Sequence, residues 1–291
     1  MDTTQDATRK TEHEARNTKH ADSLGSESRS LTAVEAQPAV RILGVRVDAL
    51  TYESLLAAIG AFVAQGSPHQ IATLNPEFVM AAQRDAAFRG VLEGCDLCLA
   101  DGVGLLWAAR RYGHPLPQRV TGSDGVPLIA ERAARTGWSL YLLGAAPGVA
   151  ERTAQVLAHR YPGLRIAGTH AGSPSNDDAE GIIVLVREAS PDLLFVAFGA
   201  PQQDLWIARY REALRVPVMM GVGGAFDHIT GVRRRAPPWV QRLNLEWLFR
   251  LATQPWRWRR QLALPRFVWA VLRQRTGKVT VTQDETLQER R

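Results

Sequence analysis

An aspartate followed by a glycine comes at the end of a short apolar segment in the first half of the chain. Asp101 is the last residue of DLCLAD (96–101), and Gly102 follows it. A carboxylate at a strand end can take a proton from a substrate hydroxyl, and a glycine beside it lets the backbone approach a ligand. An aspartate in this place can also be the N-cap of a helix beginning near Val103. Asp101 is therefore a candidate general base, with helix capping as the competing role.

Polar residues and glycines also follow four other apolar segments. Ligands of an open parallel sheet bind beyond the carboxyl ends of its strands. One such loop is weak evidence, because loops after strands generally carry Gly, Asn and Asp as caps. Five in a single sheet predict a nucleotide-sized site. The four further strand ends are Thr73 with Asn75, Gly144 to Gly148, Gly199 to Gln203, and Gly221 to Asp227.

The usual nucleotide-binding fingerprints are missing from the sequence. No GxGxxG follows the first predicted strand and no GxxxxGK[ST] occurs, which disfavours dinucleotide-binding and P-loop proteins. The glycines of 221–224 come late, and no helix is expected to open after them. The loop 144–148 does open a predicted helix, whose amides could bind a phosphate, although a tight turn explains it nearly as well. Arg119 offers a guanidinium to phosphate or carboxylate, and Ser123 or Asp124 is expected to cap the next helix.

Apolar segments alternate with amphipathic ones from Val40 to Gly231. This alternation predicts an α/β domain over 39–232, with a Rossmann-like, mostly parallel sheet and helices on both faces. The predicted strands are 41–47, 70–75, 96–101, 138–144, 164–169, 192–199 and 217–224. The predicted helices lie near 52–64, 76–91, 103–112, 125–136, 148–160, 177–189 and 202–213.

The chain ends and the cysteines limit the remaining classes. Residues 1–38 are polar and poor in aliphatic side chains, so we expect them to be disordered, and 276–291 to be frayed. The N-terminus has no apolar leader, which predicts a cytoplasmic protein. Cys95 and Cys98 form the only CxxC, and since a zinc site needs two more ligands, we expect buried structural thiols.

The basic character of the chain is concentrated in residues 233–275, here called the C-terminal appendage. It holds eleven Arg against one acid, Glu246, a net charge of +10 in a chain whose total is +6. It also holds five of the eight Trp. Arg beside Trp suits an anionic lipid surface, whereas a plain basic surface helix and a nucleic-acid arm are the alternatives.

Helices are expected within the appendage. Pro237 and Pro238 can start one at Trp239, while Pro255 and Pro265 are expected to break the remainder into shorter helices. At i,i+4 spacing Glu246 falls between Arg242 and Arg250. No stretch of 18 apolar residues occurs, so the appendage can lie on a bilayer but not cross it. Because the α/β alternation is complete by Gly231, truncation before Pro237 is expected to leave the domain folded.

Several blocks of the sequence, in order, resemble the WecG/TagA/CpsF family of glycosyltransferases. The resemblance runs from about Arg41 to Phe267. It implies an inverting transfer of a sugar from a UDP-sugar to a polyprenyl-diphosphate-linked saccharide, by an enzyme peripherally associated with the inner face of the cell membrane. The blocks are TLNPEF, ADGVGLLWAARRYG, RVTGSDG, YLLGAAPGVAE, FVAFGAPQQDLW, GVGGAFDHITG and RRAPPWVQRLNLEWLFRL.

The resemblance also assigns roles to residues of this chain. The proposed base of the family corresponds to Asp101, and the family's appendage is thought to dock on the membrane and bring arginines towards the diphosphate. The matching substrate-binding residues are Thr73, Asn75, Arg119, Gln203 and Asp227, and the matching appendage arginines are Arg235, Arg250 and Arg257. Gly144 and Gly224, in the loops after two predicted strands, are expected to bind substrate as well.

An inverting transferase needs a base and stabilisation of the departing diphosphate. Many transferases hold a metal with Asp-x-Asp, which this sequence lacks, so we predict metal independence and no cofactor. The expected partners are a UDP-sugar, a lipid-linked acceptor and an anionic membrane, without nucleic acid. The sugar (N-acetylmannosamine, its uronic acid or glucose), the acceptor, the pathway, the oligomeric state and the role of residues 1–38 stay open.

Two other classes compete with the transferase. A nucleotide-cofactor enzyme, such as a dehydrogenase or methyltransferase, would share the sheet and the glycines, but would normally show GxG after the first strand. A non-enzymatic membrane or nucleic-acid adaptor would explain the appendage but not five polar strand ends. Thermal shifts with UDP and with NAD would separate the three classes.

Overall fold

The computed structural model describes residues 38–233, 236–237, 239–240, 246–253, 258–274 and 281–282. The segment 1–37, for which we predict disorder, lies outside the described residues. Arg235 and Arg257 also lie outside them, and Arg250 is described in its backbone alone.

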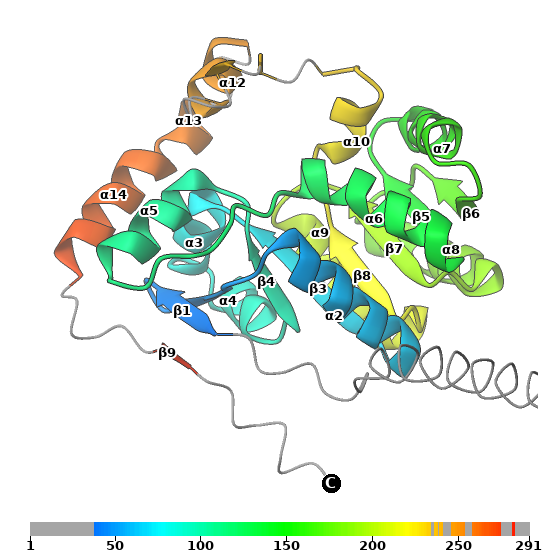
Figure 1. Ribbon diagram of the computed structural model, residues 1–291, viewed down its shortest axis with the longest axis horizontal. Helices are drawn as coiled ribbons and strands as arrows, with labels where there is room; N and C mark the ends of the chain where they lie inside the picture. Colours follow the sequence, from blue (N-terminus) through cyan, green and yellow to red (C-terminus); the bar gives the residue numbers. More distant parts are fainter. Residues whose placement is uncertain are drawn as a thin grey trace, which may run out of the picture. The chain divides into compact units, whose positions relative to one another are not determined.

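A six-stranded parallel sheet forms the centre of the fold, as predicted (Figure 1). Its strand order is β4-β3-β8-β7-β5-β6. Strands β3, β5, β7 and β8 are buried along their whole length, which requires cover on both faces of the sheet. The strands are β3 His69–Leu74, β4 Leu97–Ala100, β5 Ser139–Gly144, β6 Arg165–His170, β7 Leu193–Ala197 and β8 Val218–Gly221.

Helices connect these strands and cover the sheet. Helix α2 packs against β8 and α6, while α9 packs against β3, β7 and β8. The single helix predicted near 76–91 is instead two, because the Asp85 side chain accepts a hydrogen bond from the Phe88 N–H (3.0 Å) and caps a new helix there. The helices are α2 Tyr52–Gln65, α3 Pro76–Ala82, α4 Ala86–Glu93, α5 Val103–Arg111, α6 Gly122–Thr136, α7 Val149–Arg160, α8 Asn176–Ala189, α9 Gln202–Leu214 and α10 Ala225–Ile229.

The single strand predicted over 41–47 is wrong. Strands β1 (Ala39–Ile42) and β2 (Val45–Asp48) form an antiparallel hairpin outside the parallel sheet. Leu43 (φ 50°) and Gly44 (φ 83°) make the two-residue turn, and positive φ at both positions gives the twist that such a hairpin needs. The apolar run therefore contains a turn, which the composition does not reveal because Leu43 is apolar.

Part of the chain end also differs from expectation. Residues Val281–Thr282 form β9, which pairs with β1 antiparallel, so this part of 276–291 is not frayed. The small sheet has the order β2-β1-β9. The C-terminal part of the chain thus returns to the hairpin near Ala39.

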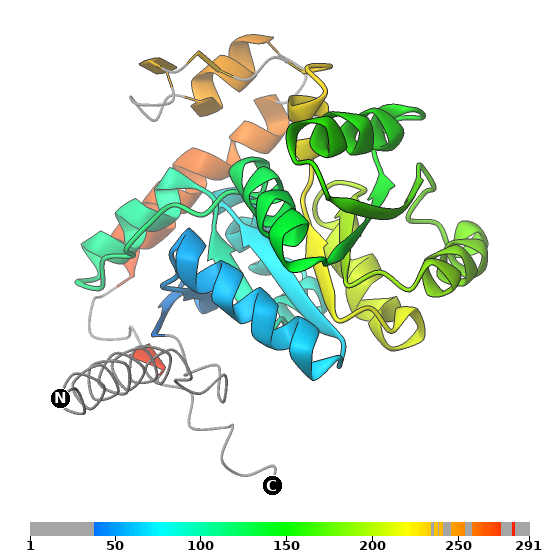
Figure 2. The ribbon, with the colours of Figure 1, turned by 45° about the vertical axis from the view of Figure 1, so that its right-hand side comes forward.

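The appendage contains helices α12 (Glu246–Thr253), α13 (Trp258–Gln261) and α14 (Ala263–Arg273). Helix α14 lies along α3 and α5 (Figures 1 and 2). Pro265 does not break the chain into two helices, because it falls in the first turn of α14, where proline is tolerated. Among the described helices, none is long and apolar enough to cross a bilayer.

The inward face of α14 belongs to the core. Phe267 and Val271 are each 1% exposed and join the cluster that contains Phe78 of α3 and Leu105 of α5. A truncation before Pro237 would expose these apolar faces to water. We therefore no longer expect a chain cut at that point to keep the stability of the complete domain.

Candidate active site

Asp101 lies directly after β4, and its carboxylate faces the start of α6. Its Oδ2 accepts a hydrogen bond from the Gly122 N–H (3.4 Å), and its own N–H donates to the Leu74 carbonyl of β3 (2.8 Å). The N-cap residue of α5 is Gly102, which has no side chain. Asp101 therefore stands one residue before the N-cap position that the competing role would give it. Its carboxylate is held at the carboxyl edge of the sheet by a neighbouring helix.

Glycines let three helix starts converge around this edge. A Cβ on Gly102 would lie 2.6 Å from Pro76 Cδ, and one on Gly104 would lie 2.7 Å from Pro76 Cγ. Gly102 thus allows a close approach to α3, and the approach of a ligand to it stays a prediction. A Cβ on Gly122 would lie 3.6 Å from Cγ2 of Thr73. The N-terminal ends of α3, α5 and α6 therefore meet beyond β3 and β4.

Thr73 and Asn75 both lie at this edge and both have partners within the chain. The Thr73 hydroxyl donates to the Gly221 carbonyl (3.0 Å), which joins the ends of β3 and β8. Asn75 is the N-cap of α3, and its Oδ1 accepts from the Phe78 N–H (3.1 Å). The two residues fix the floor of the site. Their contact with substrate stays a prediction.

Gln203 reaches the same edge from the first turn of α9. It is 1% exposed, and its Oε1 accepts from the Gly223 N–H (3.0 Å) in the loop after β8. A Cβ on Gly221 would lie 2.6 Å from Nε2 of Gln203, so glycine is required there. Gln203 therefore sets the path of the β8–α10 loop beside Thr73.

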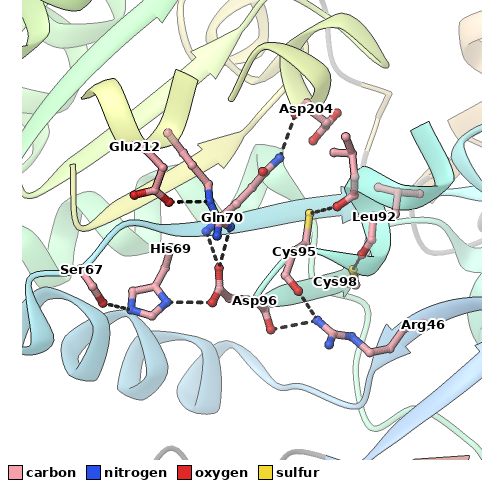
Figure 3. Close-up of polar contacts among 12 residues, drawn as sticks. Arg46, Ser67, His69, Gln70, Leu92, Cys95, Asp96, Cys98, Asp204 and Glu212 are labelled. Atoms are coloured by element: carbon pink, nitrogen blue, oxygen red, sulfur yellow. Dashed lines mark hydrogen bonds and ion pairs between the residues drawn. The ribbon is translucent and has the colours of Figure 1, made fainter. Parts of the chain in front are cut away.

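A buried carboxyl group follows Gln203. Neither carboxyl oxygen of Asp204 has a hydrogen-bond partner among the described residues, and the side chain is fully buried. Burial raises the pKa of Asp204 to about 7, against a smaller lowering by the neighbouring Gln203 amide. Its main-chain carbonyl accepts from Nε2 of Gln70 (3.0 Å; Figure 3).

The glycine-rich loop after β8 opens a helix, contrary to expectation. Gly224 is the N-cap of the short helix α10. Asp227 lies in α10, and its Oδ2 forms an ion pair with Nε of Arg233 (3.0 Å). Its charge is therefore balanced at the beginning of the appendage.

Gly144 is the predicted site residue most distant from Asp101 along the sheet. A Cβ on it would lie 2.9 Å from the Ala197 carbonyl carbon, and its φ of 99° also requires glycine. Strands β7 and β8 separate β5 from β3. At about 4.8 Å per strand, β5 lies roughly 14 Å from β3. Gly144 therefore belongs to the other half of the carboxyl edge.

Arg119 pairs with the single acid of the appendage. Its Nη1 lies 2.9 Å from Oε2 of Glu246 in α12, and the two side chains are 20% and 19% exposed. The sequence placed Glu246 between Arg242 and Arg250, whose side chains are not described. The partnership with Arg119 was missed, although a lone acid among eleven arginines was a signal of a specific partner.

Tyr52 is a site residue that the sequence analysis missed. At the start of α2, its hydroxyl oxygen accepts from the Thr121 N–H (3.0 Å), and its own N–H donates to Oε1 of Gln118 (3.0 Å). Burial raises the pKa of Tyr52, and the nearby charges of Asp124 and Asp101 act in the same direction. The hydroxyl therefore keeps its proton near neutral pH.

Thr121 caps α6, where Ser123 or Asp124 was predicted. Its Oγ1 accepts from the Asp124 N–H (3.0 Å) and lies 2.9 Å from Oδ2 of the same residue. The Asp124 carboxylate thus supports the cap instead of forming it. The prediction placed the start of this helix three residues too late.

Three further predictions concern the cysteines, a metal and the appendage arginines. Cys95 and Cys98 are buried free thiols, as predicted. Within the described residues, no three His, Cys, Asp or Glu side chains gather as a metal site requires. The roles of Arg235, Arg250 and Arg257 at a diphosphate stay predictions.

In a doubly wound parallel sheet, ligands bind beyond the carboxyl ends of the strands, which is the edge where these buried polar residues lie. Residues 40–280 match the model of the glycosyl transferase WecG/TagA/CpsF family. The chain belongs to this family and is a glycosyltransferase.

Its curated relatives include proteins of three species, all named N-acetylglucosaminyldiphosphoundecaprenol N-acetyl-beta-D-mannosaminyltransferase. The protein of Bacillus subtilis is 35% identical over 210 residues, which is 72% of this chain and 81% of the relative. That of Bacillus spizizenii is 35% identical over 203 residues, which is 70% of this chain and 78% of the relative. That of Staphylococcus aureus is 32% identical over 247 residues, which is 84% of this chain and 94% of the relative.

Proposed function

We propose that this glycosyltransferase moves N-acetylmannosamine from UDP-N-acetylmannosamine to N-acetylglucosaminyl-diphospho-undecaprenol, with inversion at the anomeric carbon. The names of three relatives that match most of their own length support this choice of sugar and acceptor. This proposal selects one of the three sugars that the sequence analysis left open.

The observation that carries the mechanism is the position of Asp101. Its carboxylate stands at the carboxyl edge and accepts from the Gly122 N–H, while Gly102 is the N-cap residue of α5. In the proposed step it takes the proton of the acceptor hydroxyl while that oxygen attacks the anomeric carbon. The bond from this carbon to the diphosphate oxygen breaks, and UDP leaves with the electron pair.

The departing diphosphate needs positive charge. Arg119 and Arg233 lie near the carboxyl edge, although each is paired with a carboxylate in the ligand-free chain. The amides at the start of α6 add a partial positive charge. We expect these groups and the appendage arginines to take the place that a metal holds in many transferases.

The appendage supplies the proposed contact with the membrane. Most of the exposed large apolar side chains of the described residues lie in it, including Trp247, Trp258 and Trp269. On α14, Phe267 and Val271 point into the core, whereas Trp269 and its neighbours are exposed. An amphipathic, arginine-rich segment of this kind suits an anionic surface. Docking there would raise the local concentration of the lipid-linked acceptor.

A panel of UDP-sugars with a synthetic prenyl-diphospho-N-acetylglucosamine tests the proposed reaction. We expect turnover with UDP-N-acetylmannosamine, a β-linked product, and the same rate in EDTA as in Mg²⁺. Preference for UDP-glucose or the uronic acid would contradict the choice of sugar. Activity lost in EDTA and restored by Mg²⁺ or Mn²⁺ would overturn metal independence.

Vesicle binding tests the membrane contact. Replacing Trp247, Trp258 and Trp269 together by Gln should weaken binding to anionic vesicles at least ten-fold, since each indole loses its place at headgroup depth. The control is Leu185→Gln on α8, an exposed apolar residue outside the appendage whose exposed fraction equals that of Trp247. Wild-type binding should weaken as salt rises, because surface charges are screened. Equal, salt-insensitive binding to neutral vesicles would contradict the electrostatic part.

A further inference from the structure

Tyr52 holds the segment that carries Arg119 and the start of α6. Its N–H binds the Gln118 side chain and its hydroxyl oxygen binds the Thr121 N–H, each at 3.0 Å. Tyr52 of α2 thus forms hydrogen bonds with this segment on both sides of Arg119. Helices α2 and α6 also pack against each other along the sheet (Figure 2).

The start of α6 is fixed by two other parts of the chain and by its own N-cap residue. The Thr121 N–H goes to Tyr52, the Gly122 N–H goes to Asp101, and the Asp124 N–H goes to the Thr121 hydroxyl. The first N–H groups of a helix have no partner within the helix, so each of these bonds fixes the direction of the helix start. The hydrogen bond from the Thr121 N–H to Tyr52 lies one residue before the hydrogen bond from the Gly122 N–H to Asp101.

Space around this helix start is limited. Thr121 is 4% exposed, and a Cβ on Gly122 would lie 3.4 Å from the Val222 carbonyl oxygen. The Thr121 N–H belongs to the peptide between Val120 and Thr121, and the Gly122 N–H that points at Asp101 belongs to the next peptide, so the two are joined through the Thr121 Cα. Loss of the Tyr52 hydroxyl would release the first peptide, and a rotation there would also shift the Gly122 N–H.

We propose that Tyr52 is a positioning residue of the transfer reaction, acting through the Thr121–Gly122 peptide to hold the Asp101 carboxylate in line with the acceptor hydroxyl. The inference rests on the proposed role of Asp101 as base. A misplacement of about 1 Å can lower a rate roughly 100-fold, so removal of one of several restraints is expected to give a smaller loss.

The test is Tyr52→Phe in the complete chain, which removes one oxygen atom. We expect kcat to fall about ten-fold while KM for the UDP-sugar stays within about two-fold, since the base is displaced whereas Arg119 is still held by Glu246. Tyr210→Phe is the matched control, because its hydroxyl also makes a hydrogen bond, to Asn176 (3.1 Å), on the exposed face of α9. An unchanged kcat in Tyr52→Phe, or an equal loss in Tyr210→Phe, overturns the proposal.

The double variant with Asp101→Asn separates this inference from the proposed function. If Tyr52 acts through Asp101, adding Tyr52→Phe to Asp101→Asn lowers kcat no further. A further ten-fold loss shows that Tyr52 acts elsewhere and overturns the inference. Full activity of Asp101→Asn alone removes the base assignment, which is a separate failure.

A second variant covers the case in which Tyr52→Phe does not fold. Gln118 is exposed and binds the other end of the same residue, so Gln118→Ala loosens the segment with little risk to the fold. We expect a two- to five-fold fall in kcat, with KM for the donor again unchanged. A rise in KM with constant kcat would place the segment in donor binding and overturn the positioning role.

Discussion

Strands β3 and β4 carry polar clusters at both ends, and the two ends differ in the groups that contact their carboxylates. At the amino end, Ser67 Oγ lies 3.0 Å from Nε2 of His69, and Nδ1 of His69 lies 2.9 Å from Oδ1 of Asp96 (Figure 3). This is the order of contacts found in a Ser-His-Asp hydrolase. At the carboxyl end, the Asp101 carboxylate accepts a hydrogen bond from the Gly122 N–H of α6 at 3.4 Å.

The side chains of the amino-end cluster link several elements of the fold. The ring of His69 is stacked on Phe62 with 3.9 Å between centroids, and Oδ2 of Asp96 accepts from the Gln70 N–H (2.8 Å). Arg211 of α9 lies 4.0 Å from the same carboxylate. These contacts join β3 and β4 to α2 and α9. A triad-like order of residues therefore does not by itself define an active site, whereas the position of a carboxylate in the fold is informative.

The largest effect that separates the two ends is expected from Asp101→Asn. As the base it should lower kcat by roughly 10²–10⁴-fold and leave UDP-sugar binding close to normal, because the amide cannot take the proton. Asp96→Asn makes the same change at the other end of β4 and should leave kcat within about two-fold. Steady-state kinetics and UDP titration measure both. Near wild-type turnover of Asp101→Asn would abolish the contrast.

A second, smaller effect is expected from Asp204→Asn, on the pH dependence of the free energy of unfolding. The folded pKa of Asp204 is about 7 against an ordinary 3.8, so the unfolded chain loses this proton first as pH rises. Stability should therefore fall between about pH 4 and pH 7 in the wild type, by on the order of 4 kcal/mol at most. The Asn variant should lack this fall. Urea unfolding at pH 5 and pH 8 tests it, and parallel pH profiles of the two proteins would refute a buried neutral acid.

The smallest effects are expected at the amino-end cluster. Burial alone would raise the pKa of Asp96, but hydrogen bonds from His69 and the Gln70 N–H outweigh it and leave the pKa lowered. Its stabilisation is present above the ordinary value near 3.8 and is lost as pH falls through the folded pKa. Asp96→Asn should thus lower the unfolding midpoint at pH 7 more than at pH 3.

Ser67→Ala completes the comparison at this end. It should change stability by about 1 kcal/mol or less and leave sugar transfer unchanged. It should also leave any background hydrolysis of p-nitrophenyl acetate unchanged. A hydrolysis rate that disappears with Ser67 would show that the amino end is a reactive site after all.

The sequence allowed the parallel sheet, its helices and the polar carboxyl edge to be predicted, because buried strands and crossover helices leave a periodic pattern. The hairpin at Leu43–Gly44 was hidden, since its turn contains an apolar residue. The contacts of Tyr52 with Thr121 and of Arg119 with Glu246 could not be predicted, because they join elements 69 and 127 positions apart in the chain. Pattern reasoning locates strand ends, and only packing decides which distant side chains meet there.

The pairing of β9 with β1 changes how the appendage should be regarded. Ala39 and Thr282 are direct partners, and Cα atoms of opposed residues in such a ladder lie about 5 Å apart. The appendage lies between β8 and β9, so it is a loop anchored at both ends and not a free tail. The beginning and the end of the ordered domain are also neighbours. A circular permutant that joins them by a short linker, with its new ends in an exposed loop, is therefore expected to keep the same sheet and the same active-site edge.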